Sequence, residues 1–291
     1  MKTTADSFDA YEAIRTLLPA MPGPGAGQSL SSLMDMADQV DAFVFDAFGV
    51  LNVGDCPIPG ASERVRELRA AGKLIRVLSN AASYDRAAAF AKFERLGFPL
   101  TEEELVTSRD ATLQAVDDRL WGVIAAPEDT LTDLAYPAIR LEDAPDDYDR
   151  AEGFLFLSTS DWTDRRQALL QASLARRSRT VLIGNADLVA PRETGLTLEP
   201  GHYAQSLPGG DIRFFGKPFP DVYDLVRVTL PGILPERIAM CGDTLHTDIL
   251  GAAAQGWCSV LVTADGLFAG EDTLSYEARS GIVPDWRVAR I

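Results

Sequence analysis

Short apolar runs alternate along most of this chain with segments of helical periodicity, and this alternation constrains the fold more than any other feature. The runs at 42–48 and 74–79 have the apolar and aromatic character of strands buried on both faces. Between them, residues 61–71 place apolar side chains on one helical face, and Gly72 is suited to end that helix. Strands that alternate with helices of this length predict an α/β fold with a doubly wound, parallel, Rossmann-like sheet.

A further helix is expected after the strand at 74–79. Ser83 is placed to cap its N-terminus, because a serine hydroxyl can accept a hydrogen bond from a free backbone N–H group. The spacing of Phe90, Phe93 and Leu96 predicts that these side chains are buried, and Gly97 is expected to end the helix.

The pattern divides the chain into three parts. Residues 1–38 are expected to form a helical appendage, interrupted by a segment too rich in Pro and Gly for a helix or strand. Residues 39–107 and 209–291 carry the alternating pattern of the core, and the run at 212–217 is expected to resume its sheet. Residues 108–208 are expected to form an inserted α/β domain, with strand-like runs of its own at 121–126, 153–158 and 180–185. What the appendage does is left open between docking on the core and mediating dimerisation.

Charge and composition exclude several classes of function. The 291 residues include 27 Lys and Arg against 43 Asp and Glu, a net charge of −16. Binding to nucleic acid or to an anionic membrane needs a basic surface, so neither is expected. The chain has no apolar run long enough to span a bilayer, no signal-peptide pattern and three cysteines without a Cys-x-x-Cys pair. A reduced, cytoplasmic protein is the expectation.

Polar residues suited to phosphate or metal chemistry follow each of the strong strand-like runs assigned to the core. Asp46 follows the run at 42–45, Ser79 and Asn80 end the run at 74–79, and Lys217 follows the run at 212–216. Asp243 follows the run at 237–242 and precedes Asp248 by five residues. Since parallel sheets carry their sites at the carboxyl ends of the strands, these side chains are expected to meet.

Such a set suits phosphoryl transfer through an aspartyl phosphate. A carboxylate such as Asp46 can attack phosphorus and divide hydrolysis into two easier steps. The charge on the phosphoryl oxygens then has to be neutralised. Mg²⁺ held by Asp46 and Asp243 could do so, together with the ammonium group of Lys217 and hydrogen bonds from Ser79. Asp248 is expected behind this set, within reach of the metal ligands or Lys217.

The segments FDAFGVL, LSNA, GKPFPDVY and GDTLHTD resemble the four motifs of the haloacid dehalogenase superfamily of phosphatases. The inserted section resembles the cap domain of the class IIA, NagD-like branch, around Asn185, Ala186 and Asp187 with Pro191 and Gly201 nearby. The resemblance covers residues from about 41 to about 265.

This resemblance implies a Mg²⁺-dependent phosphohydrolase that acts on a small phosphorylated metabolite, a sugar or nucleotide phosphate. Asp46 would be the nucleophile, and Asp46, Asp243 and the main-chain carbonyl of Phe48 would hold the metal. Ser79, Asn80 and Lys217 would bind the phosphate, and Asp187 would face the substrate from the cap. By analogy with other capped phosphatases, a homodimer is possible.

Phe48 departs from the pattern, because the second Asp of the usual Asp-x-Asp motif serves as general acid and base. A phenyl ring cannot transfer a proton, and such help is worth about 10²- to 10⁴-fold in rate. Three explanations stay open. His246 could replace the missing acid, the substrate could carry a good leaving group such as an acyl or aryl phosphate, or the protein could mainly bind or sense a phosphometabolite.

Other reaction classes fit less well. A dehalogenase would need no metal and would have little use for Asp243 in this arrangement. A phosphonate hydrolase would need a cap lysine for a Schiff base, and residues 108–208 contain no lysine. The sequence contains neither a Gly-x-Ser-x-Gly nor a P-loop motif.

Overall fold

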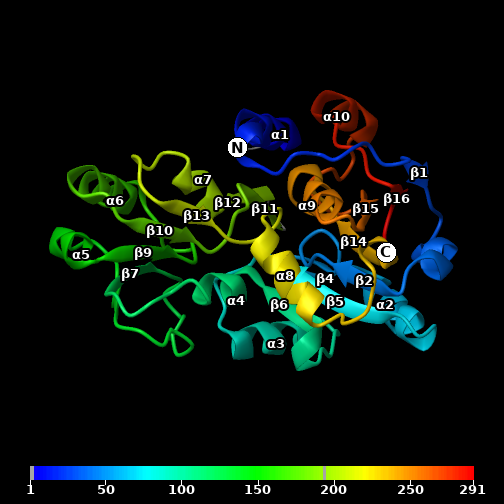
Figure 1. The fold of residues 1–291 in the computed structure, drawn as a ribbon, viewed down its shortest axis with the longest axis horizontal. Coiled ribbons are helices and arrows are strands. Elements are labelled where there is room, and N and C mark those ends of the chain that lie inside the picture. The colour runs from blue at the N-terminus through cyan, green and yellow to red at the C-terminus, as the bar shows by residue number, and fades with distance from the viewer. Residues whose placement is uncertain (1–2, 193–194) are drawn as a thin grey trace.

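The computed structural model describes residues 3–192 and 195–291, and its largest element is a seven-stranded sheet (Figure 1). Every strand pairing described in this sheet is parallel. The strands lie in the order β1 (Gln28–Ser29), β16 (Trp286–Val288), β15 (Cys258–Val262), β14 (Ile238–Gly242), β2 (Ala42–Phe45), β5 (Leu74–Ser79) and β6 (Leu105–Thr107). The predicted doubly wound parallel sheet is confirmed.

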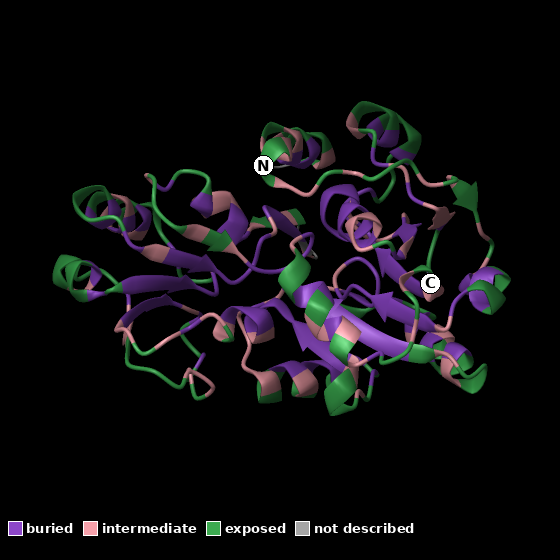
Figure 2. Ribbon diagram, in the orientation of Figure 1, coloured by how far each residue is buried: buried purple, intermediate pink, exposed green. Residues whose placement is uncertain are grey.

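Helices pack against this sheet, and Figure 2 shows its central strands almost wholly buried while the outer faces of the helices are exposed. The helices of this part are α2 (Ala61–Ala70), α3 (Arg86–Arg95), α4 (Ser108–Leu113), α8 (Pro220–Val228), α9 (Leu250–Ala254) and α10 (Thr273–Ser280). Three short 3₁₀ or π turns accompany them, at Glu102–Glu104, Pro235–Arg237 and Leu245–Ile249. No helix in the described ranges is both long and apolar enough to cross a membrane.

The helix expected after β5 is present, but Ser83 does not cap it. Asp85 is the N-cap of α3, and its Oδ1 accepts a hydrogen bond from the N–H of Ala88 at 2.8 Å. The Ser83 hydroxyl instead donates to the hydroxyl of Ser158 at 3.0 Å, a long-range contact that a local capping rule cannot foresee. Phe93 is buried as predicted, while Phe90 is half-buried.

A second, five-stranded sheet lies beside the first and is parallel throughout its described pairings (Figure 1). Its order is β13 (Ile212–Phe214), β10 (Thr180–Ile183), β9 (Gly153–Phe156), β7 (Trp121–Ile124) and β8 (Ala138–Arg140). The helices α5 (Pro145–Arg150), α6 (Asp164–Arg176) and α7 (Pro200–Ala204) and the hairpin of β11 (Val189–Arg192) and β12 (Gly195–Leu198) belong to this part. A smaller hairpin, β3 (Asn52–Val53) with β4 (Cys56–Pro57), lies in the first part. We call residues 121–214 the cap and the rest of the α/β structure the core.

The expectation that the run at 212–217 resumes the core sheet is wrong, because β13 pairs with β10 at the edge of the cap sheet. An apolar run has the same character in either sheet, so its pattern does not say which sheet it joins. Before the chain first passes from the core to the cap, α4 packs against α8 of the core. The domain boundaries at 108 and 208 are a prediction from the sequence. From the contacts of α4 and β13 we propose boundaries at 121 and 214 instead.

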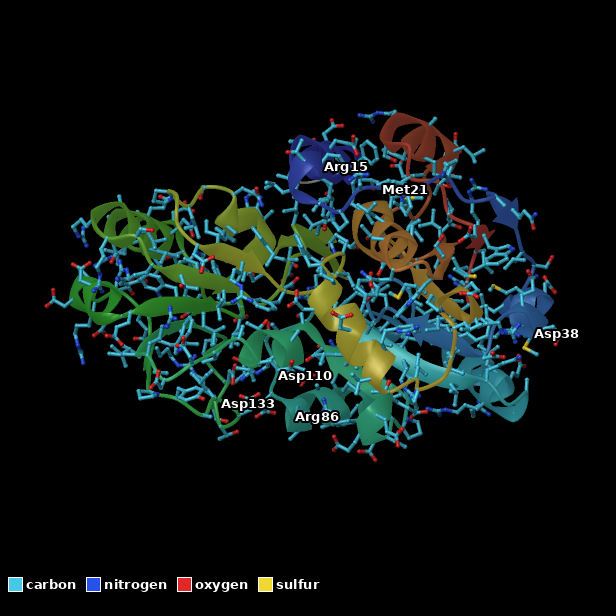
Figure 3. All side chains as sticks on the ribbon, viewed as in Figure 1. Arg15, Met21, Asp38, Arg86, Asp110 and Asp133 are labelled. Atoms are coloured by element: carbon cyan, nitrogen blue, oxygen red, sulfur yellow. The ribbon has the colours of Figure 1, made fainter. Side chains whose placement is uncertain are left out.

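Two ion pairs, one buried and one partly buried, join the core to the cap through Arg109 of α4. Its Nη1 lies 2.6 Å from Asp129 Oδ2 and its Nη2 lies 2.6 Å from Asp133 Oδ1, both on the loop that follows β7. Arg86 of α3 pairs with Asp110 of α4 at 3.2 Å; Figure 3 labels Arg86, Asp110 and Asp133. The two Arg109 contacts help to set the position of the cap over the core.

The N-terminal residues dock on the core. They form α1 (Thr4–Ala13), the 3₁₀ turns Arg15–Leu17 and Leu33–Gln39, and strand β1. In Figure 1, α1 lies beside α10, and the carboxylate of Asp9 accepts a hydrogen bond from Arg279 at 2.6 Å. Phe8 and Tyr11 of α1 are buried. Of the two roles left open for this segment, docking on the core is the one observed.

Candidate active site

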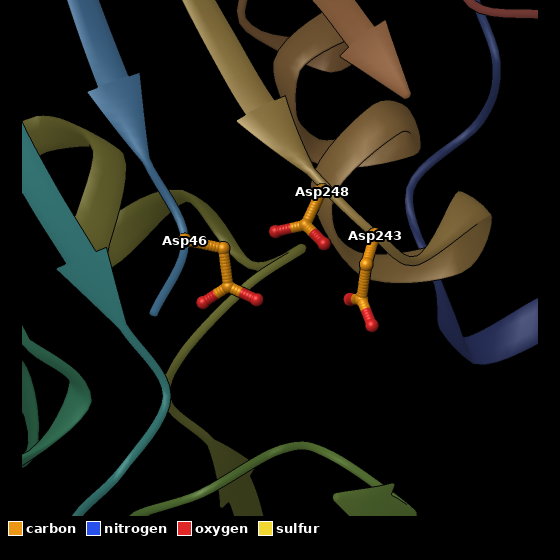
Figure 4. A group of neighbouring side chains, drawn as sticks. All are labelled: Asp46, Asp243 and Asp248. Atoms are coloured by element: carbon orange, nitrogen blue, oxygen red, sulfur yellow. The ribbon is translucent and has the colours of Figure 1, made fainter. Parts of the chain in front are cut away.

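Three carboxylates meet at the carboxyl ends of β2 and β14. Asp46 follows β2, Asp243 follows β14, and Asp248 lies in the π-helical turn Leu245–Ile249 (Figure 4). Because β2 and β14 are neighbouring parallel strands, they end at the same edge of the sheet. Each residue offers an oxygen within 4.8 Å of the others. A group of buried carboxylate oxygens is the donor set that hard divalent cations prefer, so these residues fit such a cation.

Lys217 lies among these carboxylates. Its Nζ is 2.5 Å from Asp46 Oδ1 and 2.8 Å from Asp248 Oδ1, and the side chain is almost wholly buried. Burial alone would lower the pKa of Lys217, but the charges of Asp248 and Asp46 outweigh it and raise the pKa above its ordinary value. Lys217 is therefore a fixed positive charge. It reaches the site from the segment that follows β13 of the cap sheet, not from a core strand as expected.

Three acids around one ammonium group leave an excess of negative charge in a buried place. Burial raises the pKa of Asp46, Lys217 opposes this, and the charges of Asp248 and Asp243 add to it. Burial and Asp248 also raise the pKa of Asp243. A cation bound between them would favour the ionised forms of both carboxyl groups.

Two glycines make room for the carboxylate of Asp243. A Cβ atom at Gly266 would lie 2.1 Å from Asp243 Oδ2, and one at Gly49 would lie 2.4 Å from the same oxygen. Asp243 Oδ2 also accepts a hydrogen bond from the N–H of Leu267 at 2.7 Å. The loop at Gly266 thus fixes the orientation of this carboxylate.

Asn80, at the end of β5, connects the core side of the site to the cap. Its Oδ1 accepts a hydrogen bond from the N–H of Lys217 at 2.7 Å, and its Nδ2 donates to the Lys217 carbonyl at 3.1 Å. The same Nδ2 donates to Asp187 Oδ1 at 2.8 Å. Ser79 precedes it, and its hydroxyl accepts from the N–H of Ala81. Ser79 lies beside a small void next to Phe48 and Tyr84, not in the lining of the main cavity.

A cavity of about 440 Å³ lies between the core and the cap. Its core wall includes Asp46, Phe48, Asn80, Tyr84, Asp243, Thr244 and Thr247. Its cap wall includes Glu128, Ser158, Thr159, Ser160, Asn185, Asp187, Arg192, Thr197, Glu199 and Tyr203. Hydroxyl, amide and carboxyl groups therefore surround the space in front of Asp46.

Phe48 lines the cavity, and two cations lie close to its ring. Lys92 Nζ lies 4.4 Å from the ring centroid and the Arg192 guanidinium carbon lies 4.8 Å from it. Both distances are within the range of cation–π contacts. Arg192 comes from the β11–β12 hairpin of the cap, so the phenyl ring is also a contact between core and cap.

Asp187 faces the cavity from the cap loop that precedes β11, as the resemblance implied. Burial raises the pKa of Asp187 well above its usual range, Lys217 opposes this, and the charge of Asp46 adds to it. The N–H of Asp187 donates to Asn185 Oδ1 at 2.9 Å. A Cβ at Gly201 would lie 2.6 Å from the Asp187 carbonyl oxygen, so the loop packs closely on α7.

His246 is not among the described residues that line the cavity. Its ring is buried and stacks on Tyr11 of α1 with 5.1 Å between centroids, and its Nε2 lies 2.6 Å from Glu12 Oε1. Burial lowers the pKa of His246, although Glu12 opposes this. The hypothesis that His246 replaces the missing acid gains no support from this position.

Sequence reasoning missed the part that α1 plays beside the site. The Tyr11 hydroxyl accepts a hydrogen bond from the N–H of Leu188, next to Asp187, at 3.1 Å. Thr4 donates to the carbonyl of Leu267, next to the Asp243 loop, at 2.8 Å. The apolar side chains at helical spacing in the appendage indicate a buried face, but no pattern indicates what that face contacts. Arg192 and Glu199 of the cap wall were also missed.

Comparison with known proteins agrees with this geometry. The profile of the haloacid dehalogenase-like hydrolase family matches residues 43–129, and the HAD-hydrolase-like profile matches residues 214–287. Together they cover more than half of the chain and contain every core residue of the site.

Relatives align over most of the chain. Chronophin of Rattus norvegicus is 28% identical over 276 residues, which cover 90% of this chain and 89% of the relative. Glycerol-3-phosphate phosphatase of Homo sapiens is 28% identical over 302 aligned residues, with 87% of this chain and 89% of the relative covered.

The fold is also found among solved structures. A possible sugar phosphatase of the same superfamily from Cytophaga hutchinsonii has a TM-score of 0.79 at 23% identity, covering 91% of this chain and 98% of that one. The two family profiles confirm the family that the four sequence motifs indicated, and the solved structure agrees with the fold. The chain belongs to the haloacid dehalogenase-like hydrolases.

Proposed function

We propose that the protein is a Mg²⁺-dependent phosphohydrolase that acts on a small phosphorylated metabolite through an aspartyl-phosphate intermediate. The observation that carries the proposal is the position of Lys217, whose Nζ lies within 2.8 Å of both Asp248 and Asp46, the carboxylate that lines the cavity. A fixed ammonium group beside a buried carboxylate is suited to bind and neutralise a phosphoryl group that the carboxylate attacks.

In this proposal each residue has a separate task. A carboxylate oxygen of Asp46 attacks phosphorus, while Lys217 neutralises charge on the phosphoryl oxygens. Asn80 holds the Lys217 backbone in place through its two hydrogen bonds. Asp248 orients Lys217. To hydrogen-bond the phosphate, the Ser79 side chain would rotate away from its present contact with the N–H of Ala81.

Asp46, Asp243 and the main-chain carbonyl of Phe48 would hold the metal. Bound there, Mg²⁺ would supply positive charge to the phosphoryl oxygens and favour the ionised form of Asp46.

Names of relatives and the size of the cavity support the substrate class. The similar proteins include glycerol-3-phosphate phosphatases and phosphoglycolate phosphatases. A cavity of about 440 Å³ lined by hydroxyl and amide groups suits a small polar organic phosphate such as a sugar phosphate. A cytoplasmic location and a homodimer remain part of this proposal.

Phosphate release from sugar, nucleotide, acyl and aryl phosphates, with Mg²⁺ and with chelator, tests the proposal. Wild type is expected to release phosphate only with the metal, and Asp46→Asn is expected to release none. Asp221→Asn, on the exposed start of α8, is the matched control and should keep wild-type activity. Hydrolysis that survives Asp46→Asn would contradict the aspartyl-phosphate route.

Phe48 favours one alternative, a protein that binds or senses a phosphometabolite without efficient hydrolysis. In that case no ester would be hydrolysed, while phosphometabolites would still raise the melting temperature, because a ligand that binds the folded state stabilises it. Lys217→Met would then abolish this stabilisation.

A further inference from the structure

The proposed function leaves one proton without a donor. When Asp46 displaces an alkoxide from phosphorus, the leaving oxygen needs a proton, and Phe48 cannot supply it. The inference that follows rests on the proposed function and concerns which residue of this chain carries out that transfer.

Five carboxyl groups line the cavity among the described residues: Asp46, Glu128, Asp187, Glu199 and Asp243. Asp46 and Asp243 are committed to the nucleophile and the proposed metal. Glu128 is exposed, on the loop after β7.

Glu199 has both oxygens engaged. Its Oε1 accepts from the Thr197 hydroxyl at 2.8 Å, and its Oε2 accepts from Asn185 Nδ2 at 3.1 Å. Burial raises the pKa of Glu199, and Arg192, 3.5 Å from Oε1, opposes this. With both oxygens engaged, Glu199 has no oxygen free for a substrate.

Asp187 differs from these four. Its Oδ1 accepts from Asn80 Nδ2, the same nitrogen that donates to the Lys217 carbonyl. Its Oδ2 has no hydrogen-bond partner among the residues that the structure describes. Since Asp187 lines the cavity, this oxygen is available to a bound substrate.

The surroundings of Asp187 suit the protonated acid. A neutral carboxyl group has one oxygen that only accepts hydrogen bonds and one that carries the proton. Asn80 donates to Oδ1, which leaves Oδ2 as the proton-bearing oxygen. Burial and the nearby charge of Asp46 favour this neutral form and outweigh the opposing charge of Lys217, and binding of a dianionic phosphate would favour it further.

The loop also holds the carboxyl group in place. The N–H of Asp187 donates to Asn185, the N–H of Leu188 donates to Tyr11, and Gly201 packs against the Asp187 carbonyl. Proton transfer is efficient only when donor and acceptor are held in position, and these contacts from three elements provide that.

We propose that Asp187 is the general acid and base of this protein, supplied by the cap in place of the residue that Phe48 replaces. In the first step, Asp46 forms a bond to phosphorus and the ester P–O bond breaks. The electron pair of that bond stays on the leaving oxygen, which takes the proton from Asp187 Oδ2. In the second step, a water oxygen bonds to phosphorus, Asp187 takes a proton from the water, and the bond between phosphorus and Asp46 breaks. The sum is ester plus water giving alcohol plus phosphate.

The test compares two esters in the Asp187→Asn variant. Glycerol phosphate has an alkoxide leaving group that needs a proton, whereas 4-nitrophenyl phosphate has one that leaves without it. Because kcat/KM reports on steps up to cleavage of the ester, kcat/KM for glycerol phosphate is expected to fall about 10²- to 10⁴-fold, and that for 4-nitrophenyl phosphate less than about tenfold.

The control is Glu199→Gln, which makes the same carboxyl-to-amide change in the same cap wall. It is expected to leave the ratio of the two kcat/KM values unchanged. The melting temperature of each variant establishes that it is folded.

Equal losses on both esters would overturn the proposal and make Asp187 a binding residue only. No loss on either ester would also overturn it. Both outcomes leave the proposed phosphatase intact. Absence of metal-dependent release from wild-type protein on every ester would instead overturn the proposed function, and this inference with it.

Discussion

The core wall and the cap wall of the cavity are built in different ways. The core carboxylates follow adjacent parallel strands, and Asp243 fits so closely against Gly49 and Gly266 that neither position has room for a Cβ atom. The cap wall comes from a loop and a hairpin, and side-chain hydrogen bonds to Asn80 and Tyr11 hold Asp187 and Leu188 in place. We infer that the core wall fixes the nucleophile, whereas the cap wall, which supplies Asp187, can change to suit the leaving group.

Removing the central charge of the core wall should have the largest effect. Lys217→Met leaves Asp46 and Asp248 buried without their partner, and breaking a buried ion pair in this way costs about 3–5 kcal/mol. We expect that loss in the free energy of unfolding, measured with urea in the presence of chelator. Arg150→Met, which breaks an exposed pair with Asp147, should cost less than about 1 kcal/mol. Similar losses in the two variants would mean that the core wall is no more constrained than the surface.

Gly266→Ala tests the close fit around Asp243. A methyl group 2.1 Å from Asp243 Oδ2 must displace the carboxylate or the loop. Disturbing the groups that orient a metal ligand typically costs about 10- to 100-fold in metal affinity. Mg²⁺ affinity, measured from the rise in melting temperature with metal concentration, should fall by that factor. Gly209→Ala, where a Cβ meets nothing within 4 Å, should bind Mg²⁺ as wild type does.

Tyr11→Phe tests the cap wall. The substitution keeps the ring against His246 but leaves the buried N–H of Leu188 without its partner, which costs about 1–3 kcal/mol. We expect that cost in urea unfolding, together with a raised KM, because the neighbouring Asp187 is held less firmly. Tyr136→Phe, at an exposed side chain, is the control. An unchanged KM in the Tyr11 variant would mean that α1 does not support the cap wall.

The smallest expected effect is a pH dependence at the contact between α1 and the core. The pKa of His246 is lowered in the folded protein, so the neutral ring stabilises the fold above the ordinary histidine pKa. As pH falls below about 6.5, that stability should be lost, by at most about 1.4 kcal/mol per pH unit for one proton. The groups facing this ring are Glu12, Tyr11, Phe8 and Arg15. His246→Gln should lessen the pH slope of the unfolding free energy; an equal slope would exclude His246 as its source.

Periodicity and motif spacing predicted the core wall better than the cap wall. Asp46 and Asp243 could be placed together because parallel strands end at one edge of a sheet, whatever lies elsewhere in the chain. Lys217 was placed near them although its preceding strand was assigned to the wrong sheet. The contact of Tyr11 with Leu188 joins residues 177 positions apart, and no local pattern encodes such a pairing. Which hydrogen bonds hold Asp187 likewise depends on tertiary packing.

The docking of α1 and β1 affects the order in which the parts of the molecule can fold. Thr4 bonds to Leu267, Asp9 pairs with Arg279, and β1 pairs with β16 near the other end of the chain. On the ribosome, α1 and β1 are therefore synthesised well before these partners, and Thr4 precedes Leu267 by 263 positions. Contacts between residues far apart in the sequence form slowly, because a large loop has to close, with a loss of chain entropy, before these contacts can stabilise the fold. A segment that is synthesised early is therefore among the last to reach its place. The α1 helix cannot dock beside the loops of Asp187 and Asp243 until its partners Leu267 and Arg279 have been made.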